Sequence, residues 1–249
     1  MPYPSLLFIH GEGTAAWLWE PWRRHLRPFG WETNVLDLRG HGRSLPIDYT
    51  TVTLEDYIAD IESVVGQIAA QSRTPVLAGW GMGALLALMM ASRRQEVPGV
   101  VLLGPVATKE AGGGASLQEL QRIPAGPIGP AELGVATDGT ATALADLTDE
   151  EKTRLRNEMK DAIESGVALR QAERGVSVPV DTVQRPVLVL SGDVEDGRGA
   201  EPGGRVAETY GGQRVVVPGV GRWGIVYHEA AVADMAWRVD AWLKKVLTK

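Results

Sequence analysis

Short apolar segments alternate with longer amphipathic stretches along the 249 residues of this chain. The short segments carry Val, Leu and Ile at nearly every position, which is typical of strands buried on both faces of a parallel sheet. The pattern predicts an α/β fold with a mostly parallel, doubly wound sheet of about six strands, covered on both faces by helices in right-handed crossovers. The strands are expected at Ser5–Ile9, Glu32–Leu36, Pro75–Ala78, Val100–Leu103, Val187–Leu190 and Arg214–Val217. The helices are expected at Ala16–Arg27, Leu54–Ala70, Met82–Arg94, Pro202–Tyr210 and His228–Leu247.

A long interval between the fourth and fifth predicted strands departs from this alternation. It includes consecutive glycines at 112–114 and a segment rich in proline and glycine at 123–127. Two capping boxes, Ser116–Glu119 and Thr148–Glu151, mark helix starts, because the hydroxyl and the later carboxylate satisfy the first free amides of a helix. We predict a mostly helical cap at residues 105–182, inserted into a core made of residues 1–104 and 183–249.

Composition excludes several kinds of partner. The net charge is −6, with 25 basic residues scattered among 31 acidic ones, so we expect no binding of nucleic acid. No apolar run reaches the roughly 18 residues of a membrane-spanning helix, so we expect no membrane association. Residues Met1–Pro4 run into an apolar segment without the features of a secretory signal, which predicts a cytoplasmic protein.

The sequence contains no cysteine, which excludes disulfides, thiolate metal ligands and a cysteine nucleophile. It also has no phosphate-binding loop, no dinucleotide fingerprint and no cluster with the spacing of metal ligands. We therefore expect no cofactor and no metal.

Four motifs stand at the ends of predicted strands. They are His10-Gly11-Glu12-Gly13, Asp37-Leu38-Arg39-Gly40-His41-Gly42-Arg43-Ser44, Gly79-Trp80-Gly81-Met82-Gly83 and Val217-Pro218-Gly219-Val220-Gly221-Arg222-Trp223-Gly224. Their order and positions resemble the α/β-hydrolase superfamily, from about Tyr3 to Leu247. The likeness is closest to compact members that are similar to small esterases, hydroxynitrile lyases and C–C bond hydrolases.

The resemblance implies that the third motif is the elbow that presents the family's nucleophile. Gly79 and Gly83 would allow the close approach of strand and helix, and the position of the nucleophile is Gly81. Glycine has no side chain, and neither Trp80 nor Met82 is a nucleophile, so we expect no acyl-enzyme. Gly81 also suits the positive φ of such a turn, so a plain turn without chemistry is the alternative.

Arg222 stands where the resemblance places the family's general base. A guanidinium stays protonated near neutral pH, so it cannot accept a proton from a nucleophile. The triad acid is expected at Glu195, which has the matching spacing, or at Asp196, one residue further on, and the alternative is a solvated acidic turn without a role in catalysis. An ion pair between Arg222 and either carboxylate would act as a structural strut or as a clamp for a carboxylate or enolate ligand.

The oxyanion site is better preserved, since it would be built from the backbone amides of Glu12 and Met82, which side-chain changes leave in place. The carboxylate of Glu12 would repel a developing oxyanion unless it is protonated or itself reacts. Burial favours the protonated form, so Glu12 could serve as a general acid or base. The alternatives are a carboxylate turned to solvent or paired with an arginine.

Three ring side chains are candidates for the substrate-binding site. His10 is expected to border this site and to brace the oxyanion loop. Trp80 and Trp223 flank the site and would either stack against a flat ligand or pack in the core. The cap supplies apolar residues that indicate a hydrophobic or aromatic ligand, among them Leu117, Leu120 and Leu133.

Three functions are compatible with these residues. The favoured hypothesis is a cofactor-independent, non-hydrolytic enzyme, such as a lyase, isomerase or cyclase, that acts on an apolar or aromatic metabolite through Glu12 and Arg222. The first alternative is an inactive pseudoenzyme that binds a ligand or a protein partner. The second is a hydrolase in which Glu12, Glu195 or Asp196 activates water directly. The expected partner is a small molecule under the cap, and a homodimer is compatible with the sequence.

Overall fold

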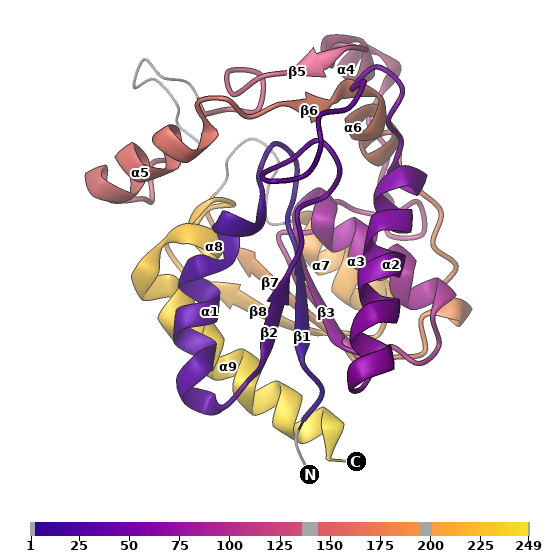
Figure 1. The fold of residues 1–249 in the computed structure, drawn as a ribbon, viewed down its shortest axis with the longest axis vertical. Coiled ribbons are helices and arrows are strands. Elements are labelled where there is room, and N and C mark those ends of the chain that lie inside the picture. The colour runs from indigo at the N-terminus through magenta and orange to yellow at the C-terminus, as the bar shows by residue number, and fades with distance from the viewer. Residues whose placement is uncertain (1–2, 136–143, 195–200, 249) are drawn as a thin grey trace.

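The computed structural model of the chain describes residues 3–135, 144–194 and 201–248. Its core is a sheet of six parallel strands in the order β2-β1-β3-β4-β7-β8 (Figure 1). The strands are β1 (Leu6–Ile9), β2 (Thr33–Val35), β3 (Val76–Trp80), β4 (Val100–Leu103), β7 (Val187–Gly192) and β8 (Gln213–Val217). All six strands predicted from the sequence are present, and the parallel, doubly wound sheet is confirmed.

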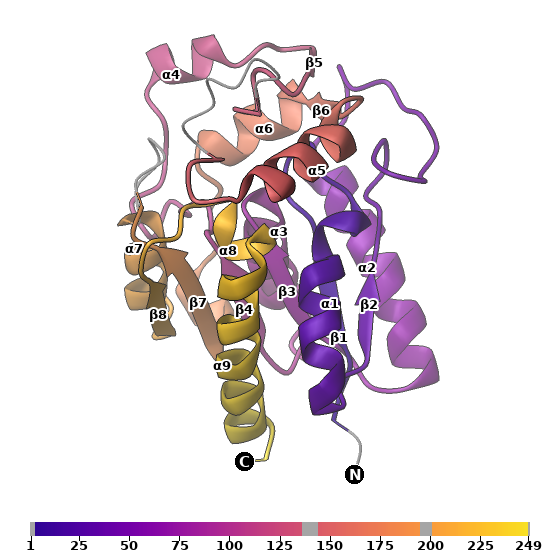
Figure 2. The ribbon, with the colours of Figure 1, turned by 90° about the vertical axis from the view of Figure 1, so that its left-hand side faces the viewer.

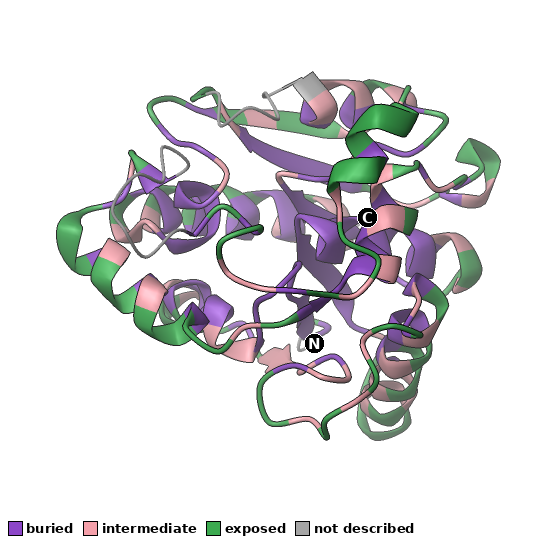
Figure 3. Ribbon diagram, turned by 90° about the horizontal axis from the view of Figure 1, so that it is seen from above, coloured by how far each residue is buried: buried purple, intermediate pink, exposed green. Residues whose placement is uncertain are grey.

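Helices cover both faces of this sheet, because successive residues of a strand point to opposite sides. In β1, Leu6 and Phe8 join the apolar cluster on one face, whereas Leu7 and Ile9 join the cluster on the other. The first face carries α1 (Glu20–Leu26), α8 (Gly224–Tyr227) and α9 (Glu229–Leu247), and the second carries α2 (Leu54–Gln71), α3 (Met82–Arg93) and α7 (Glu201–Thr209). Seen from above, the buried strands lie between helices whose outer sides are exposed (Figure 3). None of the described helices has both the length and the hydropathy of a bilayer-spanning segment.

The predicted helix at 16–27 is divided in the structure. A 3-10 turn, η1 (Ala16–Trp19), precedes α1, and a second one, η2 (Arg27–Phe29), follows it. Pro21 lies in the first turn of α1, where its missing N–H costs no intrahelical hydrogen bond. The predicted helix at 228–247 is α9, which begins one residue later.

The segment between β4 and β7 lies above the carboxyl ends of the strands (Figures 1 and 2). It contains α4 (Leu117–Arg122), β5 (Pro127–Ile128), α5 (Asp149–Met159), β6 (Glu164–Ser165), α6 (Gly166–Glu173) and η4 (Val180–Thr182), with β5 and β6 paired antiparallel. Both predicted capping boxes are formed, since Ser116 and Thr148 each accept the backbone amide three residues on. The mostly helical cap is thus present in the described residues, and its division from the core at 105 and 182 stays a prediction.

Glu151 links the cap to the core, because its carboxylate accepts hydrogen bonds at the N-termini of two helices. One carboxylate oxygen accepts the amide of Thr148 at 2.8 Å, in the capping box of α5. The other accepts the amide of Glu229 at 2.8 Å, at the start of α9. Burial opposes the charge of this carboxyl, but these amides hold the pKa of Glu151 below its usual range. One carboxylate therefore fixes the cap helix relative to the last helix of the core.

Replacing Gly79 by alanine is expected to lower the free energy of unfolding by about 3 kcal/mol, because the new Cβ would overlap the backbone of Gly83 where β3 meets α3. Urea denaturation measures this loss. Gly66→Ala is the matched control: in α2, no atom lies within 4 Å of the place for a Cβ at Gly66, so alanine should stabilise the protein by about 1 kcal/mol. Equal denaturation midpoints for Gly79→Ala and the wild type would contradict the close approach.

Candidate functional site

The turn between β3 and α3 has the strand-turn-helix form that the third motif predicts. Gly81 has φ 58° and ψ −121°, a conformation that is strained for any residue with a side chain. Strand β3 and helix α3 approach closely here, since a Cβ on Gly79 would overlap the backbone of Gly83, and α3 also lies close to the end of β1, since a Cβ on Gly83 would overlap the carbonyls of Ile9 and His10. The turn therefore keeps the geometry of an elbow, although its central residue has no side chain.

A buried ion pair fills the space beside Gly81. The Arg222 guanidinium donates through Nη2 to Glu12 Oε1, and the Met82 amide donates to Glu12 Oε2 at 3.0 Å. The side chains of Arg222 and Glu12 are only 12% and 2% exposed. A Cβ on Gly81 would stand 2.5 Å from Arg222 Nη2 and 2.7 Å from Glu12 Oε2. The ion pair and a side chain at position 81 therefore compete for the same space.

The carboxylate of Glu12 occupies an oxyanion site that was expected to stay open. The Met82 amide, one of the two donors predicted for that site, donates to Glu12 Oε2. In this structure an oxygen of the protein itself therefore takes the place that a ligand oxygen would have at this amide, and the oxyanion role of the two amides stays a prediction. Of the alternatives for Glu12, the structure shows the pairing with an arginine. Each of its oxygens accepts a hydrogen bond, as suits an ionised carboxylate.

Arg222 has a carboxylate partner that the motifs did not indicate. The predicted triad acids, Glu195 and Asp196, lie outside the described residues, and the guanidinium pairs with Glu12. Trp80 holds Arg222 in two ways: its ring centre lies 4.5 Å from the guanidinium carbon, and its Nε1 donates to the Arg222 carbonyl at 2.9 Å. Glu12 and Trp80 thus fix the orientation of the cation.

The three rings predicted at the ligand site are buried among protein atoms. Trp80 and Trp223 pack against each other with ring centres 4.7 Å apart, and they are 0% and 2% exposed. His10 is fully buried, and its Nε2 accepts the Leu38 amide at 3.0 Å. Burial, together with the nearby His41, lowers the pKa of His10 to about 4, so the ring is neutral and braces this loop. A direct contact of the three rings with a ligand stays a prediction.

A cavity of about 350 Å³ lies beside the ion pair, at the carboxyl ends of β4 and β7. Arg222 forms part of its wall, and the glycines at 112–114 and the first turn of α7 form other parts. The other charged side chains on the described wall are Glu119, Glu173 and Arg205. Arg222 thus connects the cavity to the elbow through Glu12. In residues 3–135, 144–194 and 201–248, no group of three or more His, Asp or Glu side chains is placed to hold a metal ion.

The cap closes directly over the loop that carries Glu12. Leu133 packs against this loop, since a Cβ on Gly13 would overlap the Leu133 side chain. Leu120 is also buried, whereas Leu117 is 79% exposed. None of these leucines is among the described residues that line the cavity. Leu133 thus packs on the loop, and the apolar character of the ligand stays a prediction.

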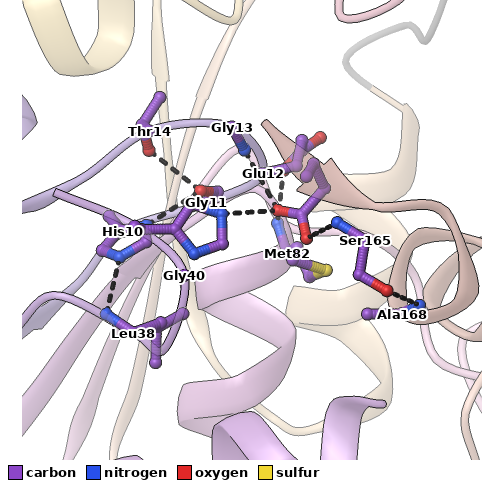
Figure 4. A network of polar contacts seen from close by, with 12 residues as sticks. His10, Gly11, Glu12, Gly13, Thr14, Leu38, Gly40, Met82, Ser165 and Ala168 are labelled. Atoms are coloured by element: carbon purple, nitrogen blue, oxygen red, sulfur yellow. Dashed lines mark hydrogen bonds and ion pairs between the residues drawn. The ribbon is translucent and has the colours of Figure 1, made fainter. Parts of the chain in front are cut away.

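A second buried network, which no sequence motif revealed, joins the cap to the core (Figure 4). Glu164 of β6 is 0% exposed and accepts the Gly13 amide at 3.0 Å and the Tyr57 hydroxyl at 2.7 Å. The Ser165 amide donates to it at 2.6 Å, and His41 Nε2 lies 3.3 Å away, close enough for an ion pair but without the alignment of a hydrogen bond. Tyr57 and Gly13 are 107 and 151 residues from Glu164 in sequence, so no local pattern predicts the cluster.

This network holds opposite charges inside the protein. Burial opposes the charge of Glu164, but His41, Tyr57 and the Gly13 amide hold the pKa of that carboxyl below its usual range. Burial likewise opposes the charge of His41, but the Glu164 carboxylate outweighs this effect and raises the pKa of His41. Burial also raises the pKa of Tyr57, which therefore stays a hydrogen-bond donor. The network is an ion pair with neutral donors around it.

The stabilising effect of the Glu164–His41 pair is expected to depend on pH. The pKa of His41 is raised above 6.5 in the folded protein, so its contribution is complete below that pH and is lost as the pH rises through the raised value. The pKa of Glu164 is lowered below 4.5, so its contribution is complete above that pH and is lost as the pH falls. We expect the wild type to be more stable than the double variant His41→Gln/Glu164→Gln. The difference between their free energies of unfolding should be largest between pH 4.5 and 6.5. A difference that stays constant with pH would show that the pair is uncharged.

Breaking the Glu12–Arg222 pair on one side should destabilise the protein more than removing both charges. Arg222→Met leaves the Glu12 carboxylate buried without its cation, which costs roughly 3–5 kcal/mol. Glu12→Gln/Arg222→Met leaves no uncompensated charge and should recover most of that loss in urea denaturation. Arg93→Met is the control, because the Arg93–Glu55 pair is 43% and 65% exposed and should contribute less than about 1 kcal/mol. Equal losses in the single and double variants would count against the buried pair.

Comparison by sequence matches residues 6–235 to the model of the alpha/beta hydrolase family. The bifunctional biotin biosynthesis protein BioHC of Cellvibrio japonicus is 34% identical over 104 residues, which make up 41% of this chain and 19% of that protein. The pimeloyl-[acyl-carrier protein] methyl ester esterase of Xylella fastidiosa is 33% identical over 100 residues, which make up 40% of this chain and 36% of that protein. The chain thus matches only a minor part of the length of these relatives.

Solved structures resemble nearly the whole chain. A thermophilic esterase from Thermogutta terrifontis has a TM-score of 0.75 at 22% identity, over 98% of this chain and 90% of that one. MenH from S. aureus has a TM-score of 0.71 at 16% identity, over 97% and 94% of the two chains. At these identities the likeness shows the fold alone. Together with the match of the family model over residues 6–235, it means that this chain belongs to the alpha/beta hydrolase family.

Proposed function

We propose that this chain is a ligand-binding member of the alpha/beta hydrolase family that forms no acyl-enzyme. The observation that carries the proposal is the ion pair beside Gly81, which takes both the place of a nucleophilic side chain and the Met82 amide. Acyl transfer needs a nucleophile, a proton acceptor and a donor for the oxyanion. Gly81 has no nucleophilic atom, Arg222 accepts no proton, and the carboxylate of Glu12 already holds the amide.

The cavity beside Arg222 supports the binding of a small molecule. Its volume of about 350 Å³ falls within the range of small-molecule sites. It lies at the carboxyl ends of β4 and β7, which is where ligands bind in open α/β sheets. A ligand there would contact Arg222 and leave the space beside Gly81 to the ion pair.

Several of the similar proteins are named as esterases, such as the methyl ester esterase of Xylella fastidiosa. Such an activity in this chain would need a nucleophile other than residue 81. Attack by a water molecule activated by Glu12 satisfies that requirement. Both carboxylate oxygens of Glu12 are already hydrogen-bonded, however, so Glu12 would have to leave Arg222 or Met82 first.

A second candidate is the non-hydrolytic, cofactor-independent enzyme predicted from the sequence, such as a lyase, isomerase or cyclase. One observation favours it: a carboxylate and a guanidinium in contact beside a cavity provide a proton acceptor and an anion-binding group in one place. In that case Glu12→Gln would abolish consumption of the ligand and leave its binding intact. Binding without consumption favours the first candidate.

The wild-type protein should show neither a burst nor a covalent mass adduct with p-nitrophenyl acetate, because residue 81 has no atom to acylate. Gly81→Ser/Arg222→His should also form no adduct, since Glu12 still holds the Met82 amide. Glu12→Gly/Gly81→Ser/Arg222→His frees that amide and should hydrolyse the ester at least about tenfold faster than the double variant. Release of p-nitrophenol and intact-protein mass spectrometry measure both effects.

A covalent adduct on the wild-type protein would overturn the proposal. Steady hydrolysis without an adduct, abolished by Glu12→Gln, would identify attack by water and would also overturn it. Arg238→Gln is the matched control for the substitutions, because Arg238 lies on the exposed side of α9 and pairs with Asp234.

A further inference from the structure

We infer that the cavity beside Arg222 binds a small molecule with a single carboxylate group, and that the Arg222 guanidinium anchors this group. The inference rests on the proposed function, since it names the class of ligand for the same cavity.

Arg222 has hydrogen-bond donors that its protein partners do not use. A guanidinium presents N–H groups from three nitrogens in one plane, in a fork that matches the two oxygens of a carboxylate. Nη2 donates to Glu12, while Nε and Nη1 donate to no acceptor in the described part of the chain. The side chain is 12% exposed and forms part of the cavity wall. The unused edge of the fork is therefore accessible to a ligand in the cavity.

Contacts within the protein hold the Arg222 guanidinium in one orientation. Trp80 lies against the face of the guanidinium at 4.5 Å, and Glu12 holds Nη2. A cation that is already oriented loses little conformational entropy when it binds an anion. The geometry therefore favours a planar oxyanion that approaches in the plane of the guanidinium.

The charge of Glu12 does not cancel the attraction of Arg222 for a second anion. Glu12 Oε2 accepts the Met82 amide, which is the first amide of α3, a helix of 12 residues. The partial positive charge of that helix N-terminus offsets part of the carboxylate charge. Part of the attraction of Arg222 for a carboxylate of a ligand therefore remains.

The cap side of the cavity has the opposite character. Glu119 of α4 and Glu173 of α6 both line it. Arg205 of α7 also lines the cavity, and its Nε donates to the Ala111 carbonyl at 2.9 Å. A second anionic group on the ligand that points to the cap would face the charges of Glu119 and Glu173. The cavity therefore suits a monocarboxylate better than a dicarboxylate.

Isothermal titration calorimetry with benzoate, benzamide and isophthalate tests this inference on the full chain. Benzoate and benzamide have nearly the same shape and differ in charge, and isophthalate adds a second carboxylate. We expect benzoate to bind at least about tenfold more tightly than either of the other probes, the difference made by one charge-assisted contact.

Two variants test whether Arg222 is the residue that binds the carboxylate. Glu12→Gln/Arg222→Gln removes both charges of the buried pair without leaving one uncompensated, and it should bind benzoate and benzamide equally. Glu12→Gln alone removes the internal competitor for the guanidinium and should bind benzoate more tightly than the wild type, and the comparison of benzoate with benzamide on the wild type holds even where neither variant folds. Arg238→Gln should leave all three affinities unchanged, because Arg238 is an exposed residue of α9.

Three results would overturn the inference. Equal binding of benzoate and benzamide would show a ligand cavity that does not select an anion. Benzoate affinity that is unchanged in the double variant would place the anion at another residue. No binding of any probe would remove the anion site, while the proposed absence of an acyl-enzyme is decided separately by the p-nitrophenyl acetate experiment.

Discussion

Removing one of two opposite charges from a protein interior costs far more than removing both, and the arrangement of this site follows from that constraint. Glu12 and Arg222 come from the loops after β1 and β8, and each is buried against the other. Their contact places a carboxylate on the first amide of α3 and a guanidinium on Trp80. A nucleophile, a ligand oxygen and a water molecule are all excluded from the space that the pair occupies. Gly81 fits beneath it because glycine needs no space there.

The loop that carries Glu12 is fixed from two directions. Glu12 itself is held by the core, through Met82 and Arg222, whereas the next residue, Gly13, donates its amide to Glu164 of the cap. The core therefore holds one residue of this loop and the cap holds the next. A movement of the cap that breaks the contact of Glu164 with Gly13 would disturb the site one residue away. The cap is thus part of the site even though its leucines do not line the cavity.

The sheet and the elbow could be predicted from the sequence because both depend on neighbours in the chain. Strands such as β1 and β3 are apolar at every position. The glycines around residue 81 allow the backbone of β3 to lie close to that of α3. The side-chain partners could not be predicted in the same way. Arg222 and Glu12 are 210 residues apart in sequence, so their contact depends on how the loops after two strands meet in the folded protein. Glu164 lies in a cap with no motif, and the exposed Leu117 shows that an apolar residue alone does not indicate which way it faces.

The positive φ of Gly81 and the two charges beside it make these three positions difficult to change one at a time. The side chain of a serine at position 81 would overlap the ion pair. A histidine at position 222 would take the guanidinium away from the buried Glu12 carboxylate, and a glycine at position 12 would take that carboxylate away from Arg222. Each of these single changes lowers stability, because it introduces a clash or separates one buried charge from the other. The residues at positions 12, 81 and 222 therefore depend on one another, although the two charged residues are 210 residues apart in sequence.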